Sequence, residues 1–401
     1  MTKSLRSEAG FSLIEVLVAT AIMLIVTGGI FTVMNPSSTM FQAQPEVVDL
    51  QQRLRIGVDT LTRDLVMAGA GAYSGSLSGS LAGFFAPIQP NIQGTDPALD
   101  DSTKGVFYRT DAITLFYVPS TASQTSIYDP MPTASAELKV NQEHNCPSSS
   151  HVCDFQVNDS VLIYDDTGAY DTLTITQIGA DSGGNDFAMV QHRQQGDLSK
   201  AYGKDAKVVK FQEHVYYYDA PNRKLMHYDG FQTATPVLDE VVGVNFEYYG
   251  DPQPPALRDG NGLSSQAVTY GPVPPKLGVV KGNWPAGENC TIQLAGGIQQ
   301  PRLANLGAAG TGLVLLTQGQ LTDGPWCPDA ANSNRFDADL FRVRKIRVTL
   351  RLQTGNPALR GVAGGGLGSL WIQPGTGTGA RLVGDQQIRF DVTPRNMNLT
   401  R

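Results

Sequence analysis

The sequence contains few of the residues from which catalytic and metal sites are most often built. Among its 401 residues there are only 5 histidines and 4 cysteines, and the histidines are scattered. The GxSxG, HExxH and Walker sequences are absent, and no cysteine stands alone as a candidate nucleophile. We therefore expect a protein that is not an enzyme and has no cofactor and no bound metal.

Positive charge is also scarce. The 30 lysines and arginines are outnumbered by 37 acidic residues, which leaves a net charge of −7. A chain with no broad basic field is not expected to bind nucleic acid specifically. Aromatic residues make up only 8% of the chain, whereas 43 glycines and 24 prolines predict many turns and long loops.

One long apolar run is present, at residues 11–34, and Glu15 is its only charged residue. At about 1.5 Å per residue a helix of this length crosses the roughly 30 Å hydrocarbon core of a bilayer. A cleaved secretory signal usually has an apolar core of only about 7–15 residues. Lys3 and Arg6 precede the run, so we expect a cytoplasmic N-terminus and an extracytoplasmic remainder.

Glu15 needs a partner, because a carboxylate within a membrane span costs on the order of 2.5–3.5 kcal/mol. The one cation that this chain places at the same depth is the free α-amino group of Phe11, created if the chain is cut after Gly10. An ordinary signal anchor does not explain Glu15. The pattern therefore indicates processing after Gly10 and a partner for Glu15 from another copy.

These residues resemble the class III signal of type IV prepilins and type II secretion pseudopilins. Gly10, Phe11 and Glu15 stand at the spacing of that signal, after a short basic leader and before about twenty apolar residues. The resemblance implies that a prepilin peptidase cuts after Gly10 and that the new amine of Phe11 is methylated. It also implies that Glu15 neutralises the N-terminus of a neighbouring subunit when helices pack into a filament. The implied partners are other major and minor pilins or pseudopilins, the inner-membrane assembly platform and the lipid bilayer.

An amphipathic helix is predicted at residues 46–67. Its apolar positions recur every three or four residues, at Val47, Leu50, Leu54, Val58, Leu61 and Leu65. Charged residues are expected on the other faces, at Arg53, Arg55, Asp59, Arg63 and Asp64. Gly69 and Gly71 are expected to end the helix. Gly28, Gly29, Pro36 and Pro45 predict an interruption before it, either as a local kink or as a span that ends at Pro36.

Short β-strands are predicted in the remainder of the chain. They lie at residues 112–118, 160–164, 172–178, 187–191, 241–249, 341–352 and 386–392, with the clearest hairpin at 207–219 and 223–229. The turn at 164–171 has three carboxylates, but it lacks an EF-hand spacing and is expected to be a plain turn rather than a calcium site. The glycine-rich stretch at 361–369 has no phosphate-binding ending and is expected to be a connector.

The four cysteines predict two disulfides. Their number is even, and the domain is expected to lie outside the cytoplasm, where disulfides persist. We favour Cys146 with Cys153 and Cys290 with Cys327, because each couple falls in one turn-rich segment, although the other two connectivities stay open. His144 and His151 each precede a cysteine by two residues, which leaves a zinc site as the alternative to the first disulfide.

The spine helix at 50–69, the late strands around 341–352 and the ending IRFDVTPRN are similar to the PilW and PulJ group of large minor pilins and minor pseudopilins. We expect an α+β, type IV pilin-like fold, with a long N-terminal helix on an antiparallel β head that carries large loop insertions. The expected parts are a cleaved leader (1–10), a transmembrane helix (11–34), an amphipathic helix (35–71) and a head (72–401) with a Gly/Pro-rich insertion at 251–334. That insertion is either an exposed elaboration or a small disulfide-stapled insert.

The function expected from this resemblance is that of a minor pilin at or near the tip of a type IV pilus, where it helps to initiate assembly. The alternatives are a J-type minor pseudopilin of a type II secretion system and a tip subunit that binds surfaces or captures DNA. The precursor is expected in the inner membrane, and the mature protein in the pilus at the cell surface or in a periplasmic pseudopilus.

Overall fold

The computed structural model describes residues 11–71, 80–92, 108–119, 123–141, 152, 154–180, 187–193, 198–204, 206–230, 233–258, 267–308, 310–356, 359–360 and 383–398. The chain divides into two compact units. One comprises Met1–Arg53 with Gln353–Gln386, and the other comprises Leu54–Leu352 with Gln387–Arg401. Gly10, His144, Cys146, His151, Cys153 and the stretch 361–369 lie outside the described residues.

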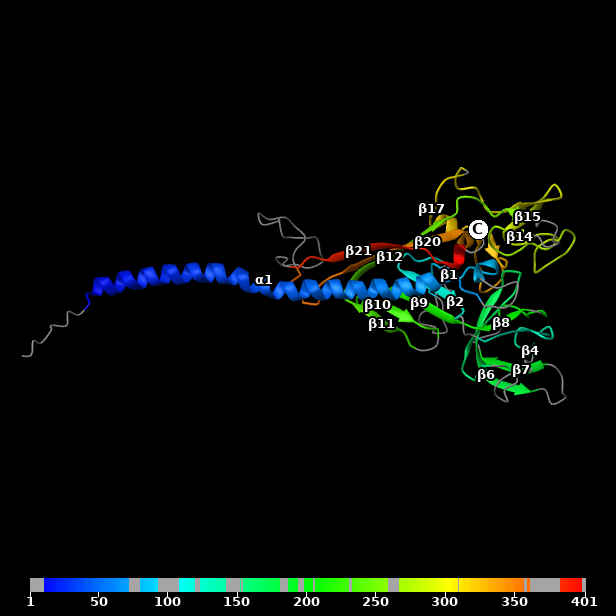
Figure 1. The fold of residues 1–401 in the computed structure, drawn as a ribbon, viewed down its shortest axis with the longest axis horizontal. Coiled ribbons are helices and arrows are strands. Elements are labelled where there is room, and N and C mark those ends of the chain that lie inside the picture. The colour runs from blue at the N-terminus through cyan, green and yellow to red at the C-terminus, as the bar shows by residue number, and fades with distance from the viewer. Residues whose placement is uncertain are drawn as a thin grey trace, which may run out of the picture. The chain divides into compact units, whose positions relative to one another are not determined.

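A single long helix, α1, spans Leu13–Met67 (Figure 1). It continues through Gly28, Gly29, Pro36 and Pro45, so the expectation that the span ends at Pro36 is wrong. A proline removes one backbone hydrogen bond from a helix. The neighbouring residues keep their hydrogen bonds, so the helix continues past the proline. Gly69, at φ +79°, follows the helix end as expected for a glycine stop.

In the unit formed by Leu54–Leu352 with Gln387–Arg401, antiparallel strands form three larger sheets and three two-stranded ribbons, an α+β architecture (Figure 1). The first sheet has the order β1-β2-β9-β10-β11, with strands Ile88–Gln89, Ala112–Tyr117, Gln212–Asp219, Lys224–Tyr228 and Thr235–Asp239. The second has the order β17-β12-β20-β21, with strands Val314–Leu316, Val241–Gly250, Val343–Leu352 and Gln386–Val392.

The third sheet has the order β3-β8-β5-β6-β7-β4, with strands Gln124–Ser126, Lys207–Lys210, Ser160–Tyr164, Tyr170–Ala180, Phe187–Arg193 and Leu138–Asn141. It has an apolar cluster of its own, which includes Val161, Ile163, Ile175 and Val208. The ribbons are β13 (Leu257–Arg258) with β14 (Ala267–Val268), β15 (Ile292–Ala295) with β16 (Ile298–Pro301), and β18 (Trp326–Cys327) with β19 (Phe336–Asp337).

The last turns of α1 pack against the first two sheets. Leu54, Leu61 and Leu65 are buried, as the apolar stripe predicts. Gly57 is buried between them, and a Cβ at this position would lie 2.5 Å from Leu238 Cδ1 on β11 and 3.4 Å from Leu350 Cδ1 on β20. Only a glycine lets the helix approach the sheets this closely.

The segment 251–334 contains a disulfide and a strand that pairs with the second sheet. Cys290 and Cys327 are buried and form the predicted disulfide, with their Cα atoms 5.2 Å apart. Strand β17 of this segment pairs with β12 of the second sheet, Leu316 opposite Tyr248. The insert is therefore joined to the β core by backbone hydrogen bonds as well as by side chains.

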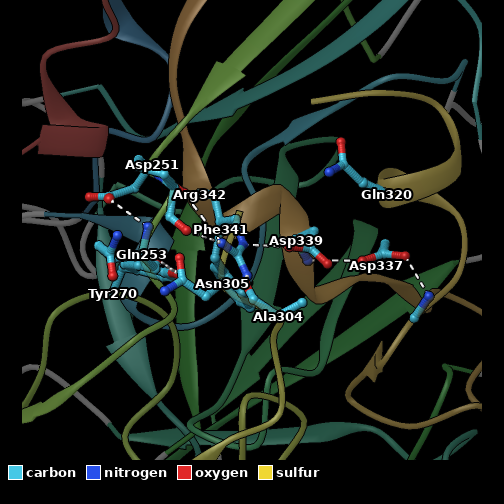
Figure 2. Close-up of polar contacts among 12 residues, drawn as sticks. Asp251, Gln253, Tyr270, Ala304, Asn305, Gln320, Asp337, Asp339, Phe341 and Arg342 are labelled. Carbon is cyan, nitrogen blue, oxygen red and sulfur yellow. Dashed lines mark hydrogen bonds and ion pairs between the residues drawn. The ribbon is translucent and has the colours of Figure 1, made fainter. Parts of the chain in front are cut away.

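The side chain of Arg342 links that insert to the β core (Figure 2). It is fully buried at the end of the 3₁₀ helix Ala338–Arg342, which immediately precedes β20. Its guanidinium donates to the backbone carbonyls of Asp251, Pro252 and Ala304 and forms an ion pair with Asp339. Because an unpaired buried guanidinium is costly, this arrangement fixes the insert against the root of β20.

Most of the predicted strands are present, with shifted ends. Strands β5 and β21 have the predicted bounds, while β20 begins at Val343 because residues 341–342 belong to the 3₁₀ helix. In β20 the buried apolar residues from Ile346 to Leu352 alternate with half-buried Arg347, Thr349 and Arg351. The turn between β5 and β6 is a hairpin turn, and two of its three carboxylates pair with lysines, Asp165 with Lys200 and Asp166 with Lys281. The third, Asp171, accepts hydrogen bonds from Ser199, Tyr202 and Asn334.

Candidate membrane and assembly segment

The predicted assembly residues lie at the start of α1. Phe11, with 88% of its surface exposed, stands two residues before the helix, and Glu15 lies in its first turn. The backbone N–H of Ser12 donates to Glu15 Oε2 over 2.9 Å, and the backbone N–H of Glu15 donates to Ser12 Oγ over 3.3 Å. This reciprocal pair is a capping box, which satisfies two backbone donors that a helix start would leave free.

Beyond this cap, the first half of α1 is apolar and uncovered. Leu13–Phe31 is long and apolar enough to cross a membrane, with a mean hydropathy of 2.3. None of this window is buried within the chain, and Leu13, Leu24, Ile25 and Phe31 are among the many exposed large side chains. Within this stretch the hydroxyl of Thr20 donates to the backbone carbonyls of Val16 and Leu17. A helix with such a surface needs lipid or other apolar helices around it.

Residues 5–31 match the family model of the prokaryotic N-terminal methylation motif. The matched stretch contains Gly10, Phe11 and Glu15 and ends where the apolar window ends. The N-terminal segment thus carries the signal of type IV pilin-like and pseudopilin-like proteins, and an apolar helix with this signal fits a membrane-anchored precursor. Neither the curated proteins nor the solved structures contain a match to this chain.

A second group of polar residues lies where the end of α1 meets the first sheet. We call Asp64, Tyr117, His214, Tyr216 and His227 the junction cluster. Asp64 is buried, so its predicted place on an outward face is wrong. Asp59 and Arg63 are exposed as expected, and they form an ion pair at 3.4 Å. The helical period places Asp64 beside Leu61 and Leu65, and its charge is accepted there because the sheet offers partners.

The two partners of Asp64 lie on strand β9. The Tyr216 hydroxyl donates to Asp64 Oδ2 over 2.5 Å, and His214 Nδ1 lies 3.3 Å from the same oxygen. His214 Nδ1 is also 2.7 Å from His227 Nε2, and His214 Nε2 is 3.1 Å from the Tyr117 hydroxyl. The rings of Tyr117, His214 and His227 stack on one another, with centroids 5.2 and 4.9 Å apart.

Burial controls the ionisation of this cluster. Burial lowers the pKa of His214, although the negative charges of Asp64 and Asp229 raise it in part. Burial also lowers the pKa of His227, and the charge of His214 lowers it further. Burial also raises the pKa of Tyr117 to about 12 and that of Tyr216 well above its usual range, with the charge of Asp64 as the next cause. At neutral pH both imidazoles are therefore neutral and both phenols keep their protons.

Sequence reasoning found Glu15 but missed the role of Ser12 as its capping partner, although the S-x-x-E spacing before an apolar run signals a capping box. It also missed the junction cluster. Asp64 is separated from His214 by 150 positions, and the register that brings His227 opposite Tyr216 depends on a strand pairing that no local spacing predicts. Of the four tyrosines at 216, 217, 218 and 228 in this hairpin, Tyr216 and Tyr228 are buried.

Proposed function

We propose that this protein is a minor pilin of a type IV pilus, cut by prepilin peptidase after Gly10 and N-methylated at Phe11. The observation that carries the proposal is the coincidence of two features at one end of α1. The apolar stretch Leu13–Phe31 is wholly uncovered, and it lies within the methylation-motif match at 5–31. A helix of this kind is held by lipid before assembly and by neighbouring apolar helices afterwards.

The assembly chemistry falls to Phe11 and Glu15. In the single chain the exposed Glu15 carboxylate accepts a hydrogen bond from the Ser12 N–H. When helices pack and exclude water, an uncompensated carboxylate costs several kcal/mol more than one paired with a cation. The amine of Phe11 on a neighbouring subunit supplies that cation once the leader has been removed. Cleavage thus creates the positive charge that compensates the buried carboxylate of Glu15.

A position at or near the filament tip is favoured by the insert at 251–334. A subunit repeated along a filament packs against neighbours at both ends of its head, whereas a terminal subunit packs at one end only. The stapled insert adds bulk together with exposed apolar side chains, among them Leu277, Val280 and Ile298, which are 58%, 65% and 66% exposed. We propose that other minor pilins cover these side chains when the tip complex forms.

The proposed partners are therefore prepilin peptidase, major and minor pilins, the inner-membrane assembly platform and the bilayer. The test is complementation of a deletion strain with wild-type protein, Gly10→Val, or no protein, followed by counts of surface filaments and immunoblots of the sheared material. Wild-type protein restores filaments and is present in them, while Gly10→Val stays uncut in the membrane and restores few. Normal pili in the deletion strain, with loss of exoprotein secretion instead, overturn the pilus assignment and indicate the minor pseudopilus of a type II secretion system.

The exposed apolar side chains of the insert also bear on a role in surface adhesion or DNA capture. Deletion of the whole insert is a poor test, because it removes β17 and the carbonyls that pair with Arg342. Leu277→Asp with Ile298→Asp leaves these contacts in place, and Val157→Asp, at a 50% exposed position outside the insert, is the matched control. Loss of filaments supports the tip-complex role, whereas intact filaments that no longer bind surfaces or DNA indicate the capture role.

A further inference from the structure

We propose that the junction cluster is a binding site for one Zn²⁺ ion, held by Asp64 Oδ2, His214 Nδ1 and His227 Nε2. These atoms come from α1, β9 and β10, and all three lie within 4.8 Å of one another. Two imidazole nitrogens and one carboxylate oxygen are a ligand set that Zn²⁺ takes readily, with a fourth position left for water. The site is independent of the processing signal at the other end of α1.

The distances fit a zinc ion with a small adjustment. Zinc bonds to nitrogen and oxygen are about 2.0–2.1 Å long, so two ligand atoms on a tetrahedral ion are about 3.3 Å apart. Asp64 Oδ2 and His214 Nδ1 are already 3.3 Å apart. His214 Nδ1 and His227 Nε2 are 2.7 Å apart and must separate by roughly half an ångström to meet that spacing. His214 keeps 15% of its side chain exposed, so the ring has room to turn.

The protons of the cluster allow the ion to bind without a buried cationic imidazole. In one tautomer of the metal-free cluster, the Tyr117 hydroxyl donates to His214 Nε2, and His214 Nδ1–H donates to His227 Nε2. If His214 shifts its proton to Nε2, that N–H donates to the Tyr117 oxygen and Nδ1 presents a lone pair. His227 Nε2 is already an acceptor, so both histidines can bind the ion as neutral imidazoles.

The groups around the ligands are those that support a metal site. Tyr216 donates to the ligating carboxylate of Asp64, and Tyr117 holds the far nitrogen of His214, so two of the three ligands have an outer partner. The charge of Asp229 also acts on both histidines, which adds negative potential at the site. Arg63, the nearby cation on α1, is 75% exposed and pairs with Asp59. An ion here joins the end of the spine helix to two strands of the first sheet.

The experiment uses the full-length protein in detergent micelles, with no histidine tag. The protein is stripped with EDTA and titrated with ZnCl₂ alone by calorimetry, and the bound metal is counted by mass spectrometry. Wild-type protein binds about one Zn²⁺ per chain, and its melting temperature rises with zinc concentration. His227→Gln lowers the affinity by more than about tenfold, and Tyr117→Phe, which removes only an outer partner, lowers it by roughly tenfold or more.

Two controls separate this site from other sources of zinc binding. His192→Gln alters a histidine on β7 that contacts the Ala136 carbonyl, and it retains the ion. His144→Gln with His151→Gln also retains it, and Co²⁺ in place of zinc gives no thiolate charge-transfer band. Binding that survives His227→Gln and His214→Gln, or is lost with the His144 and His151 pair, overturns the assignment. No zinc bound to folded wild-type protein overturns it as well and leaves the cluster as a hydrogen-bond network.

Discussion

The hydroxyl of Tyr216 on β9 donates a 2.5 Å hydrogen bond to Oδ2 of Asp64 on α1. Both side chains are buried, and Asp64 is the only carboxylate on the apolar face of the helix between Leu54 and Met67. The bond supports a buried negative charge at the contact between helix and sheet. Its loss leaves that charge with fewer donors, which is more costly than the loss of a neutral hydrogen bond.

Tyr216→Phe is therefore expected to lower the free energy of unfolding by about 1.5–3 kcal/mol in the presence of EDTA. The matched control is Tyr218→Phe, which removes a hydroxyl that donates to the Val241 carbonyl at a half-buried position and is expected to cost about 1 kcal/mol or less. Denaturant unfolding of the two variants measures the difference. Equal losses would contradict the view that the Asp64 charge depends on Tyr216.

Ser12 and Glu15 allow the structural and the electrostatic roles of the carboxylate to be separated. Glu15→Gln keeps a side chain that can complete the capping box but removes the charge, whereas Ser12→Ala keeps the charge and removes the cap at a cost of about 1 kcal/mol. We expect Glu15→Gln to be processed normally and to be missing from filaments, and Ser12→Ala to be incorporated. The reverse pattern on immunoblots of sheared filaments would show that Glu15 serves the helix start alone.

Removal of the Cys290–Cys327 disulfide is expected to destabilise the insert. The bridge spans 37 positions, and the chain-entropy model gives a loop of this length about 4 kcal/mol. Cys290→Ala with Cys327→Ala should lose about that much unfolding free energy and make 251–334 sensitive to protease. Cys146→Ala with Cys153→Ala is the comparison, since a bridge between these two would close a much shorter loop and contribute only about 2.5 kcal/mol. An unchanged proteolysis pattern after loss of the first pair would contradict the stapling role.

Asp337 gives the fold a pH dependence of known sign. This buried carboxyl accepts hydrogen bonds from the backbone N–H groups of Gly324 and Asp339 (Figure 2), yet burial raises its pKa from 3.8 to about 7. Between these values the native state binds a proton that the unfolded state releases, so the stability from this group is present at low pH and is lost as pH rises through about 7. Wild-type stability relative to Asp337→Asn should fall by on the order of 2–3 kcal/mol between pH 5 and pH 8. The control is Asp239→Asn, on the exposed face of β11, which should show no such trend. If the difference in unfolding free energy between wild type and Asp337→Asn did not change between pH 5 and pH 8, the assignment would be refuted.

The sequence predicts the parts of the fold that repeat a local pattern. The apolar stripe of α1, the alternation in β20 and the bounds of β5 follow from periods of 3.6 and 2 residues. Prolines misled the prediction, because Pro36 and Pro45 are strong local signals against a helix, and a long helix tolerates them. The Cys290–Cys327 bridge was predicted from composition and position alone.

Other features depend on contacts between distant segments and have no local signal. The six short strands among the described residues of 251–334 lack periodicity, and β17 pairs with the edge that β12 offers. From the sequence alone, Gly57 is expected to weaken the helix. In the structure Leu238 and Leu350 pack against it and leave no room for a larger side chain. From the sequence alone, Asp64 is expected to face solvent. In the structure Tyr216 and His214 contact its carboxylate. In each case tertiary packing reverses the local preference of the residue.

The central claim is that this chain is processed between Gly10 and Phe11 and enters a filament through α1. The most direct test is N-terminal sequencing and intact mass measurement of the protein from sheared surface filaments and, separately, from membranes. The account predicts a filament subunit that begins with N-methylated Phe11. A chain in either fraction that begins only at Met1, or processed protein that never leaves the membrane, would contradict it.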